Sequence, residues 1–258
     1  MRGPADPVTA KVEEKDLRQR LAALEAEAAP ATGDPLTAYQ RRWLERPGTL
    51  ERFLRADGGK VAKAGRRLRD TLKWREEARP ERVCCQACAA NDHAHYMHQV
   101  GFATTGQPLV YSDIGKAKDK RPESNVEHCI QVLERTIATM GDHGGGVETF
   151  VWLIDFHGFS SRDLNPRMAT SCLKIFSRNY PERMGRIVMV EAPWLFNAMF
   201  EFLKTVVDPV TVAKVSTCDS RAGSGGLTKR RSSSSRGPRA RAGGASWRRS
   251  WTPSPTPR

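Results

Sequence analysis

The stretch that decides the fold runs from Asn179 to Val215 and reads NYPERMGRIVMVEAPWLFNAMFEFLKTVVDPVTVAKV. A polar turn leads into a strand-length apolar run, RIVMVEA, and then into a helix-length segment that Pro193 is suited to open. The polar residues of that segment form one narrow stripe: Asn197, Glu201, Lys204 and Thr205. The remaining helix surface is apolar and needs apolar partners on two sides. These are either a sheet and a neighbouring helix, or protein on one side and lipid on the other.

The formal net charge of +13 on this 258-residue chain is concentrated near its C-terminus. Residues 221–258 hold ten of the 42 Lys and Arg residues and no acid, so the rest of the chain carries a net charge of only +3. Because this tail is rich in Ser, Gly, Pro and Arg and poor in aliphatic residues, we expect it to be disordered. It either attaches the protein electrostatically to an anionic lipid or nucleic-acid surface or simply remains solvated.

The compartment follows from what the sequence lacks. No run of 18 apolar residues is present, and the N-terminus has no apolar core of the secretory-signal type. The six cysteines do not have the spacing of a small disulfide scaffold, which favours a reducing compartment. These features predict a cytosolic protein.

The N-terminal third has the pattern of helices alone. Apolar residues at helical spacing predict a helix over Lys11–Ala29, followed by a linker over Pro30–Pro35. Two short helices follow, LTAYQRRWL and TLERFLRAD, and we expect Thr49 to be the N-cap of the second. The periodicity then predicts a longer helix over Val61–Ala78 that stops before Pro80.

Beyond residue 97, apolar strands alternate with helices. PLVYSDI, TFVWLIDF and RIVMVEA are continuous apolar runs, typical of strands buried on both faces of a parallel or mixed sheet. We expect a helix over Ser124–Met140, opened by a capping box between Ser124 and Glu127. A second helix should begin at Asn165 and Pro166. This alternation predicts an α/β layered fold.

Several motifs together point to a family. YPERMG, a strand ending in AP, the apolar helix and DPVTVAKV follow one another, and FLRADGGKVAKAGRRLRDTLKWRE, GQPLVYSDIG and LIDFHGFS precede them. In order and spacing they resemble the CRAL-TRIO lipid-binding family, typified by Sec-fourteen-like phosphatidylinositol and phosphatidylcholine transfer proteins. The resemblance covers roughly Leu36 to Val215.

The resemblance implies an α/β fold in which a mixed or parallel sheet floors a lipid pocket and helices cover it. Together with the patterns at the two ends of the chain, it predicts four parts: an N-terminal helix and linker (1–35), an all-helical subdomain (36–80), the lipid-binding domain, apparently truncated (90–216), and the basic disordered tail (217–258).

The family also implies site residues. Its apolar helix is the mobile gate of the pocket, which resolves the two-sided apolarity of that segment. In phosphoinositide-binding members, the Glu of YPERMG and the Lys of DPVTVAK hold the headgroup, and they correspond here to Glu182 and Lys214, with Thr211 beside them. The expected pocket and gate residues are Phe150, Trp152, Trp194, Phe196, Met199, Phe200 and Leu203.

The implied function is to bind a phospholipid, with phosphatidylinositol favoured, and to transfer or present it. We expect a monomeric, cytoplasmic protein that contacts anionic membrane surfaces transiently, with no enzyme activity, no cofactor and no nucleic-acid partner. Two alternatives remain open: a degenerate lipid domain that acts as a membrane-recruited interaction protein, and a carrier of another hydrophobic ligand.

The sequence departs from the family at three places. Where phosphatidylinositol-binding members have a basic pair after FLRA, this chain has Asp57 and two glycines, with Lys60 displaced. Phe150 and Trp152 replace a hydroxyl pair that serves phosphatidylcholine, which disfavours that lipid. After Val215 the chain turns at once into STCDSRAGSGG, so we expect a missing strand and an open sheet edge.

A cysteine and histidine segment, CCQACAANDHAHYMH, offers a different chemistry. Cys85 and Cys88 have the spacing of a zinc knuckle, but no second CxxC completes the signature. We therefore predict no metal site. The sequence leaves open whether a metal ion takes its ligands from this set: Cys84, Cys85, Cys88, His93, His95 and His98.

DFHGFSS is the remaining candidate for catalysis, since it places Asp155, His157 and Ser160 near a strand end. The chain has neither a GxSxG nucleophile elbow nor a phosphate-binding loop of the GxxxxGK[ST] type. Hydrolase activity is therefore not expected.

Overall fold

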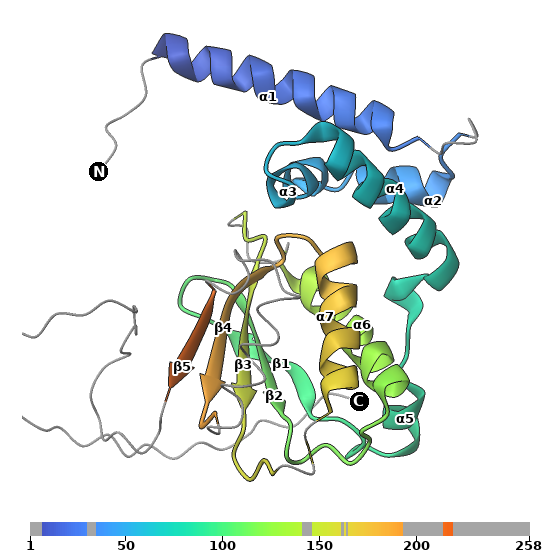
Figure 1. The fold of residues 1–258 in the computed structure, drawn as a ribbon, viewed down its shortest axis with the longest axis vertical. Helices are drawn as coiled ribbons and strands as arrows, with labels where there is room; N and C mark the ends of the chain where they lie inside the picture. The colour runs from blue at the N-terminus through green and yellow to red at the C-terminus, as the bar shows by residue number, and fades with distance from the viewer. Residues whose placement is uncertain are drawn as a thin grey trace, which may run out of the picture. The chain divides into compact units, whose positions relative to one another are not determined.

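The computed structural model describes residues 7–29, 35–140, 146–160, 163, 165–192 and 214–218, and these form seven α-helices, a 3₁₀ turn and five strands (Figure 1). The helices are α1 (Pro7–Glu27), α2 (Ala38–Leu44), α3 (Thr49–Ala56), α4 (Val61–Ala78), α5 (Gln86–Ala90), α6 (Pro122–Thr139) and α7 (Pro166–Asn179), with the 3₁₀ turn η1 at Pro80–Arg82. The strands are β1 (Met97–Phe102), β2 (Pro108–Asp113), β3 (Phe150–Asp155), β4 (Met184–Val190) and β5 (Val215–Cys218).

The five strands form one sheet in the order β1-β2-β3-β4-β5. β1 is antiparallel to β2, and every other neighbouring pair is parallel. The mixed sheet confirms the predicted α/β class, and β2, β3 and β4 lie at the three predicted apolar runs. β1 was not predicted: only Met97 of this strand is buried, and a register shift beside Gly101 interrupts its pairing.

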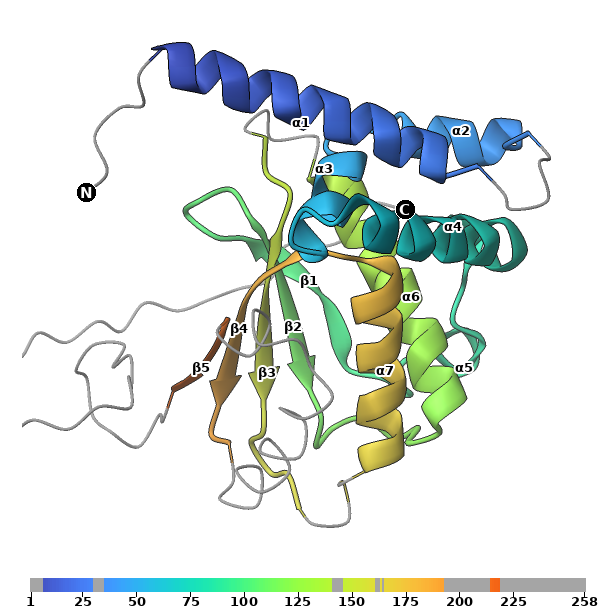
Figure 2. The same cartoon turned by 45° about the horizontal axis from the view of Figure 1, so that its top comes forward.

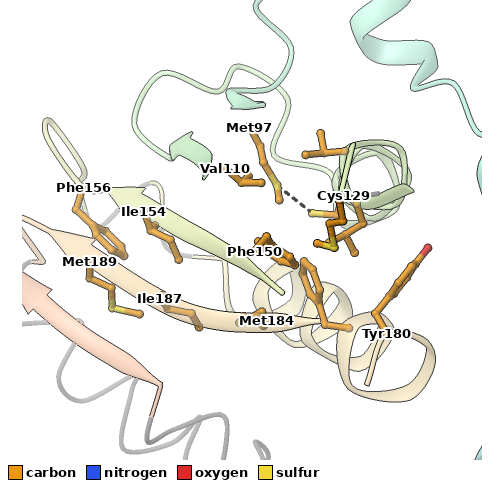
Figure 3. Packing of buried hydrophobic residues seen from close by; sticks show 14 residues of the cluster. Met97, Val110, Cys129, Phe150, Ile154, Phe156, Tyr180, Met184, Ile187 and Met189 are labelled. Atoms are coloured by element: carbon orange, nitrogen blue, oxygen red, sulfur yellow. Dashed lines mark hydrogen bonds between the residues drawn. The ribbon is translucent and has the colours of Figure 1, made fainter. Parts of the chain in front are cut away.

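Helices α6 and α7 cover one face of this sheet (Figure 2). Their apolar stripes and the facing strand residues make the principal core. Leu133 is fully buried in it, as are Val110 and Phe150, which Figure 3 labels. Burying each such side chain contributes about 1.5–3 kcal/mol, so this layer supplies much of the stability that holds the two helices against the sheet.

The four helices α1, α2, α3 and α4 share a second apolar core. Leu24 of α1, Phe53 of α3 and Leu68 and Leu72 of α4 are buried in it. Helix α4 has the predicted bounds, but the predicted cap of α3 is wrong: Thr49 is the first residue of α3, and the cap position belongs to Gly48, which has φ +71°. That left-handed conformation suits glycine, which has no Cβ to clash.

Two other helix starts test the predicted caps. The capping box at Ser124 is wrong, because α6 begins two residues earlier at Pro122, which is suited to the first helical position, and Ser124 is buried inside the first turn. The start of α7 is confirmed: the Asn165 side chain accepts a hydrogen bond from the Met168 backbone N–H at 3.0 Å.

The chain does not leave the sheet at Val215. Residues 215–218 form β5, which pairs in parallel with β4 from Ile187 to Val190, so the expectation of a missing strand is wrong. The run VSTC is β-branched at Val215 and Thr217, which suits a strand even though it is short. Among the described residues, no helix is both long and apolar enough to cross a membrane.

Candidate functional site

The YPERMG motif forms the corner between α7 and β4, and a buried ion pair fixes its first residue. Tyr180 is buried, and its hydroxyl donates a hydrogen bond to Glu134 Oε1 of α6 at 2.8 Å. Both Glu134 oxygens also accept from Arg75 of α4, at 2.8 and 3.2 Å. Burial raises the pKa of Tyr180 well above its ordinary value, so the hydroxyl remains a donor. The network therefore ties the helical N-terminal part to this corner.

Glu182, at the tip of the corner, has a backbone φ of +54°, which is unusual for a residue other than glycine. Its Oε2 lies 3.2 Å from Nζ of Lys214, and the two side chains are 27% and 21% exposed. Lys214 directly precedes β5, and its carbonyl accepts a hydrogen bond from the Ile187 N–H of β4 at 3.0 Å. The pair thus lies where two adjacent parallel strands begin.

Arg183 and Gly185 of the same motif have structural roles at this corner. The Arg183 guanidinium donates to the Glu148 carbonyl at 3.0 Å, and burial lowers its pKa to about 10. A Cβ on Gly185 would lie 2.7 Å from Thr149 Oγ1, which is too close. The glycine therefore lets β4 approach the segment that precedes β3.

The third expected headgroup residue, Thr211, lies outside the described residues. So do the five expected gate residues: Trp194, Phe196, Met199, Phe200 and Leu203. Of the predicted headgroup set, the structure therefore brings together Glu182 and Lys214.

Phe150 and Trp152 lie on the sheet face that α6 and α7 cover. Phe150 is fully buried in the principal core (Figure 3). Trp152 packs against Phe176 of α7 with ring centroids 5.3 Å apart, and its indole N–H donates to Ser112 Oγ at 2.8 Å. Both side chains pack between the sheet and the helices. Their contact with a ligand stays a prediction.

The opposite sheet face carries a second set of apolar side chains. Strand residues alternate between faces, and the parallel register aligns the sets on neighbouring strands. This set is half-buried, and neither apolar core of the described residues includes it: Leu109, Val151, Leu153, Val188 and Val190. The alternation within FVWLID was the sequence signal that could have separated these residues from Phe150 and Trp152.

A separate cleft of about 810 Å³ lies beside η1, α6 and the residues before α3. Its lining contains five arginines and three glutamates: Arg46, Arg52, Arg82, Arg135, Arg183, Glu81, Glu134 and Glu148. So many charged groups do not suit an acyl chain, which requires an apolar wall. The apolar sheet face is therefore the better surface for a lipid chain.

The position after FLRA, where the family resemblance places a basic pair, is structural in this chain. The Asp57 carboxylate is fully buried, and its Oδ1 lies 3.0 Å from Arg67 and 3.1 Å from Lys63. Lys60 is exposed at the cap position of α4. The buried carboxylate therefore holds the start of α4 in place.

The catalytic candidates do not converge. The Asp155 carboxylate accepts from the His157 backbone N–H at 2.8 Å, whereas the His157 ring lies 3.0 Å from Glu191 Oε2. Ser160 Oγ donates to Asp163 at 2.9 Å. Since the imidazole faces neither Asp155 nor the serine, the described geometry contains no relay among these three residues.

Comparison with known families agrees with this geometry. A family profile described as CRAL/TRIO domain matches residues 93–231, which is more than half of the chain. The chain belongs to the CRAL/TRIO family. The match begins just before β1 and includes every strand and the YPERMG corner.

Individual relatives are distant from this CRAL/TRIO chain. A CRAL-TRIO domain-containing protein of Schizosaccharomyces pombe is 29% identical over 182 residues, which are 70% of this chain and 18% of the relative. Phosphatidylinositol transfer protein PDR17 of Saccharomyces cerevisiae is 27% identical over 197 residues, which are 71% of this chain and 55% of that protein. The chain thus spans about half or less of these relatives.

The crystal structure of Sfh5 aligns with a TM-score of 0.55 at 18% identity and covers 65% of this chain and 66% of its own. At that identity the likeness concerns the fold alone. It supports the mixed sheet and covering helices described above.

Proposed function

We propose that this protein binds a phospholipid, phosphatidylinositol in particular, and transfers it between membranes or presents it at a membrane surface. The observation that carries the proposal is the contact between Glu182 and Lys214, which are 32 residues apart in sequence and 3.2 Å apart in the structure. An ammonium suits a phosphate and a carboxylate accepts hydrogen bonds from inositol hydroxyls, so this pair can recognise both parts of the headgroup.

Two further features support this proposal. The chain belongs to the CRAL/TRIO family, and PDR17 is named a phosphatidylinositol transfer protein. The sheet face opposite α6 and α7 offers apolar side chains for acyl chains, and each buried CH₂ of lipid is worth about 0.8 kcal/mol. In this proposal the segment that contains Trp194 and Leu203 closes the pocket, and Thr211 adds a hydroxyl near the headgroup.

The pair alone would contribute little to folding. Both side chains are partly exposed, and ion pairs of this kind stabilise proteins by about 0.5 kcal/mol. Substitutions here should therefore affect ligand recognition much more than stability, which separates a headgroup role from a structural one.

Lipid transfer measures the proposed function directly. Native mass spectrometry of the purified full chain should show a co-purified phospholipid, and the protein should move labelled phosphatidylinositol from donor to acceptor phosphatidylcholine vesicles faster than labelled phosphatidylcholine. Lys214→Ala and Glu182→Gln should each lower phosphatidylinositol transfer about tenfold, as expected for a lost charge-assisted hydrogen bond. The control is Lys174→Ala, an exposed lysine of α7.

Different failures have different meanings. If wild-type protein neither carries nor transfers lipid, the lipid-transfer function is wrong. If it transfers phosphatidylinositol and both variants do so at the wild-type rate, the headgroup assignment alone is wrong. Vesicle binding that disappears as salt increases, without transfer, would instead indicate a protein recruited by its basic tail.

A further inference from the structure

Four side chains from three separate segments converge beside the start of β1. The ligand atoms of Cys85, Cys88, His95 and His128 all lie within 4.8 Å of one another. Cys85 and Cys88 belong to the start of α5, His95 lies in the loop before β1, and His128 projects from α6. Cys85 and His95 are buried, the His128 residue is 9% exposed, and Cys88 is half-buried. Such a group is shielded from solvent on most sides.

The distances match a tetrahedral metal centre. Nδ1 of His95 lies 3.5 Å from Cys85 Sγ and 3.4 Å from Cys88 Sγ, and Nδ1 of His128 lies 3.4 Å from Cys88 Sγ. A tetrahedral zinc ion with Zn–S of about 2.3 Å and Zn–N of about 2.0 Å holds its sulfur and nitrogen ligands about 3.5 Å apart. The three contacts are therefore at the spacing that a shared central ion requires.

Both imidazoles present the correct nitrogen. The His128 Nε2 lies 2.8 Å from the Met97 carbonyl oxygen, and because a carbonyl only accepts, Nε2 must carry the proton. The lone pair of Nδ1 then faces Cys88. His95 is oriented similarly, with Nδ1 toward both sulfurs and Nε2 3.4 Å from Ser124 Oγ, a hydroxyl that can accept from a protonated Nε2. Outer partners of this kind orient histidine ligands in metal sites.

Hydrogen bonds between neutral thiols and neutral imidazoles explain the cluster less completely than a metal ion does. The two thiols have two S–H donors between them, whereas three sulfur–nitrogen contacts converge, and Cys88 faces both rings. One divalent ion engages all four ligands at once, and two thiolates neutralise its charge. Two sulfurs and two nitrogens in tetrahedral array favour zinc over metals that prefer oxygen ligands.

We propose that Cys85, Cys88, His95 and His128 bind a structural zinc ion that fastens the connection after α4 and η1 to α6. All four coordination positions come from protein side chains, so no position remains open for a substrate. This revises the expectation of no metal. The sequence pattern contained three of these ligands; the fourth comes from α6, 33 residues beyond His95.

The remaining candidates in the segment provide matched controls. Cys84 and His93 are exposed and do not belong to the cluster. Substituting them changes one thiol or one imidazole in the same stretch of sequence, but removes no ligand.

Zinc content per chain tests the proposal. The full chain, produced with zinc in the medium and freed of loosely bound metal, should contain about one zinc per molecule by elemental analysis. Cys88→Ser and His128→Asn should lose it, whereas Cys84→Ser and His93→Asn should retain it. Because the first two variants could fail to fold, wild-type protein stripped of zinc is also titrated with Co²⁺, which should give the thiolate charge-transfer absorption of a tetrahedral site at one equivalent.

The proposal is overturned if wild-type protein binds less than about a tenth of an equivalent of zinc and Co²⁺ gives no thiolate band. A disulfide between Cys85 and Cys88 in freshly purified protein would overturn it as well. Loss of zinc in Cys84→Ser would show that the ligand set is wrong.

Discussion

The buried ion pair between Arg75 and Glu134 gives the sharpest prediction about how the site is held. The Arg75 side chain is 2% exposed and that of Glu134 is 8% exposed, with a closest contact of 2.8 Å. At an effective dielectric constant of about 20, two charges at this distance attract by about 6 kcal/mol before desolvation is counted. Since Glu81 lies 3.7 Å from Arg75 and compensates part of the charge, we expect Glu134→Gln to destabilise the protein by about 3 kcal/mol.

Urea denaturation followed by circular dichroism measures this change. A loss of about 3 kcal/mol lowers the midpoint by about 1 M for a slope of about 3 kcal/mol per molar urea. The control is Glu27→Gln, which breaks the more exposed contact between Arg69 and Glu27 and should cost less than about 1 kcal/mol. The double variant Arg75→Met with Glu134→Gln should recover most of the loss, because it leaves no unpaired charge buried and keeps an amide oxygen that accepts from the Tyr180 hydroxyl.

Glu134→Gln removes the charge of this side chain but nearly preserves its shape. Its amide oxygen can still accept the Tyr180 hydroxyl, so a loss as small as that of Glu27→Gln would refute the reasoning that an uncompensated buried charge dominates. The same variant should also lower phosphatidylinositol transfer, because Tyr180 lies two residues before Glu182.

Four further substitutions probe other parts of the molecule. Leu133→Ala, at a fully buried core position, should destabilise the protein by about 2–5 kcal/mol in urea denaturation. Asn165→Ala removes the cap of α7 and should cost about 1 kcal/mol in the same assay. Burial raises the pKa of Glu148, but its two arginine partners lower it more, so the net shift is downward. The stabilisation that Glu148 provides is therefore present above its unfolded pKa of about 4.3 and is lost as the pH falls through the lower folded-state pKa, so Glu148→Gln should make stability less dependent on pH below about 4.3. Glu182→Gly relieves a left-handed conformation and should raise stability by up to about 1 kcal/mol while lowering phosphatidylinositol transfer about tenfold; transfer at the wild-type rate would contradict the headgroup role.

The order of the central elements could be predicted because the sequence carries it locally. Strands β2, β3 and β4 are continuous apolar runs, and α4, α6 and α7 have apolar residues at helical spacing. β1 carries a weaker signal, since most of its side chains are at least partly exposed and its pairing is irregular. β5 is only four residues long, so its two β-branched residues are too short a pattern to predict a strand without the pairing with β4.

The residues of the two proposed sites could also be predicted only in part. Glu182 and Lys214 could be named from motifs, but their contact depends on β5 lying beside β4. His128 carried no signal, because nothing in the pattern of α6 indicates that one histidine faces two cysteines about 40 residues earlier. Local patterns predict elements, whereas a site built from several elements requires the tertiary fold.

The two proposed sites lie at structurally different kinds of position, and this explains what each can do. The cysteine and histidine cluster is mostly buried, and it joins the segment of Cys85 and Cys88 and the loop of His95 to α6. The Glu182 and Lys214 pair is partly exposed at the start of two strands, with a conformation at Glu182 that glycine would adopt at lower cost. Because Glu182 keeps its charged side chain in an unfavourable backbone conformation, on a corner anchored by Arg75, Glu134 and Tyr180, its position supports the proposal that this carboxylate is held in place for a ligand.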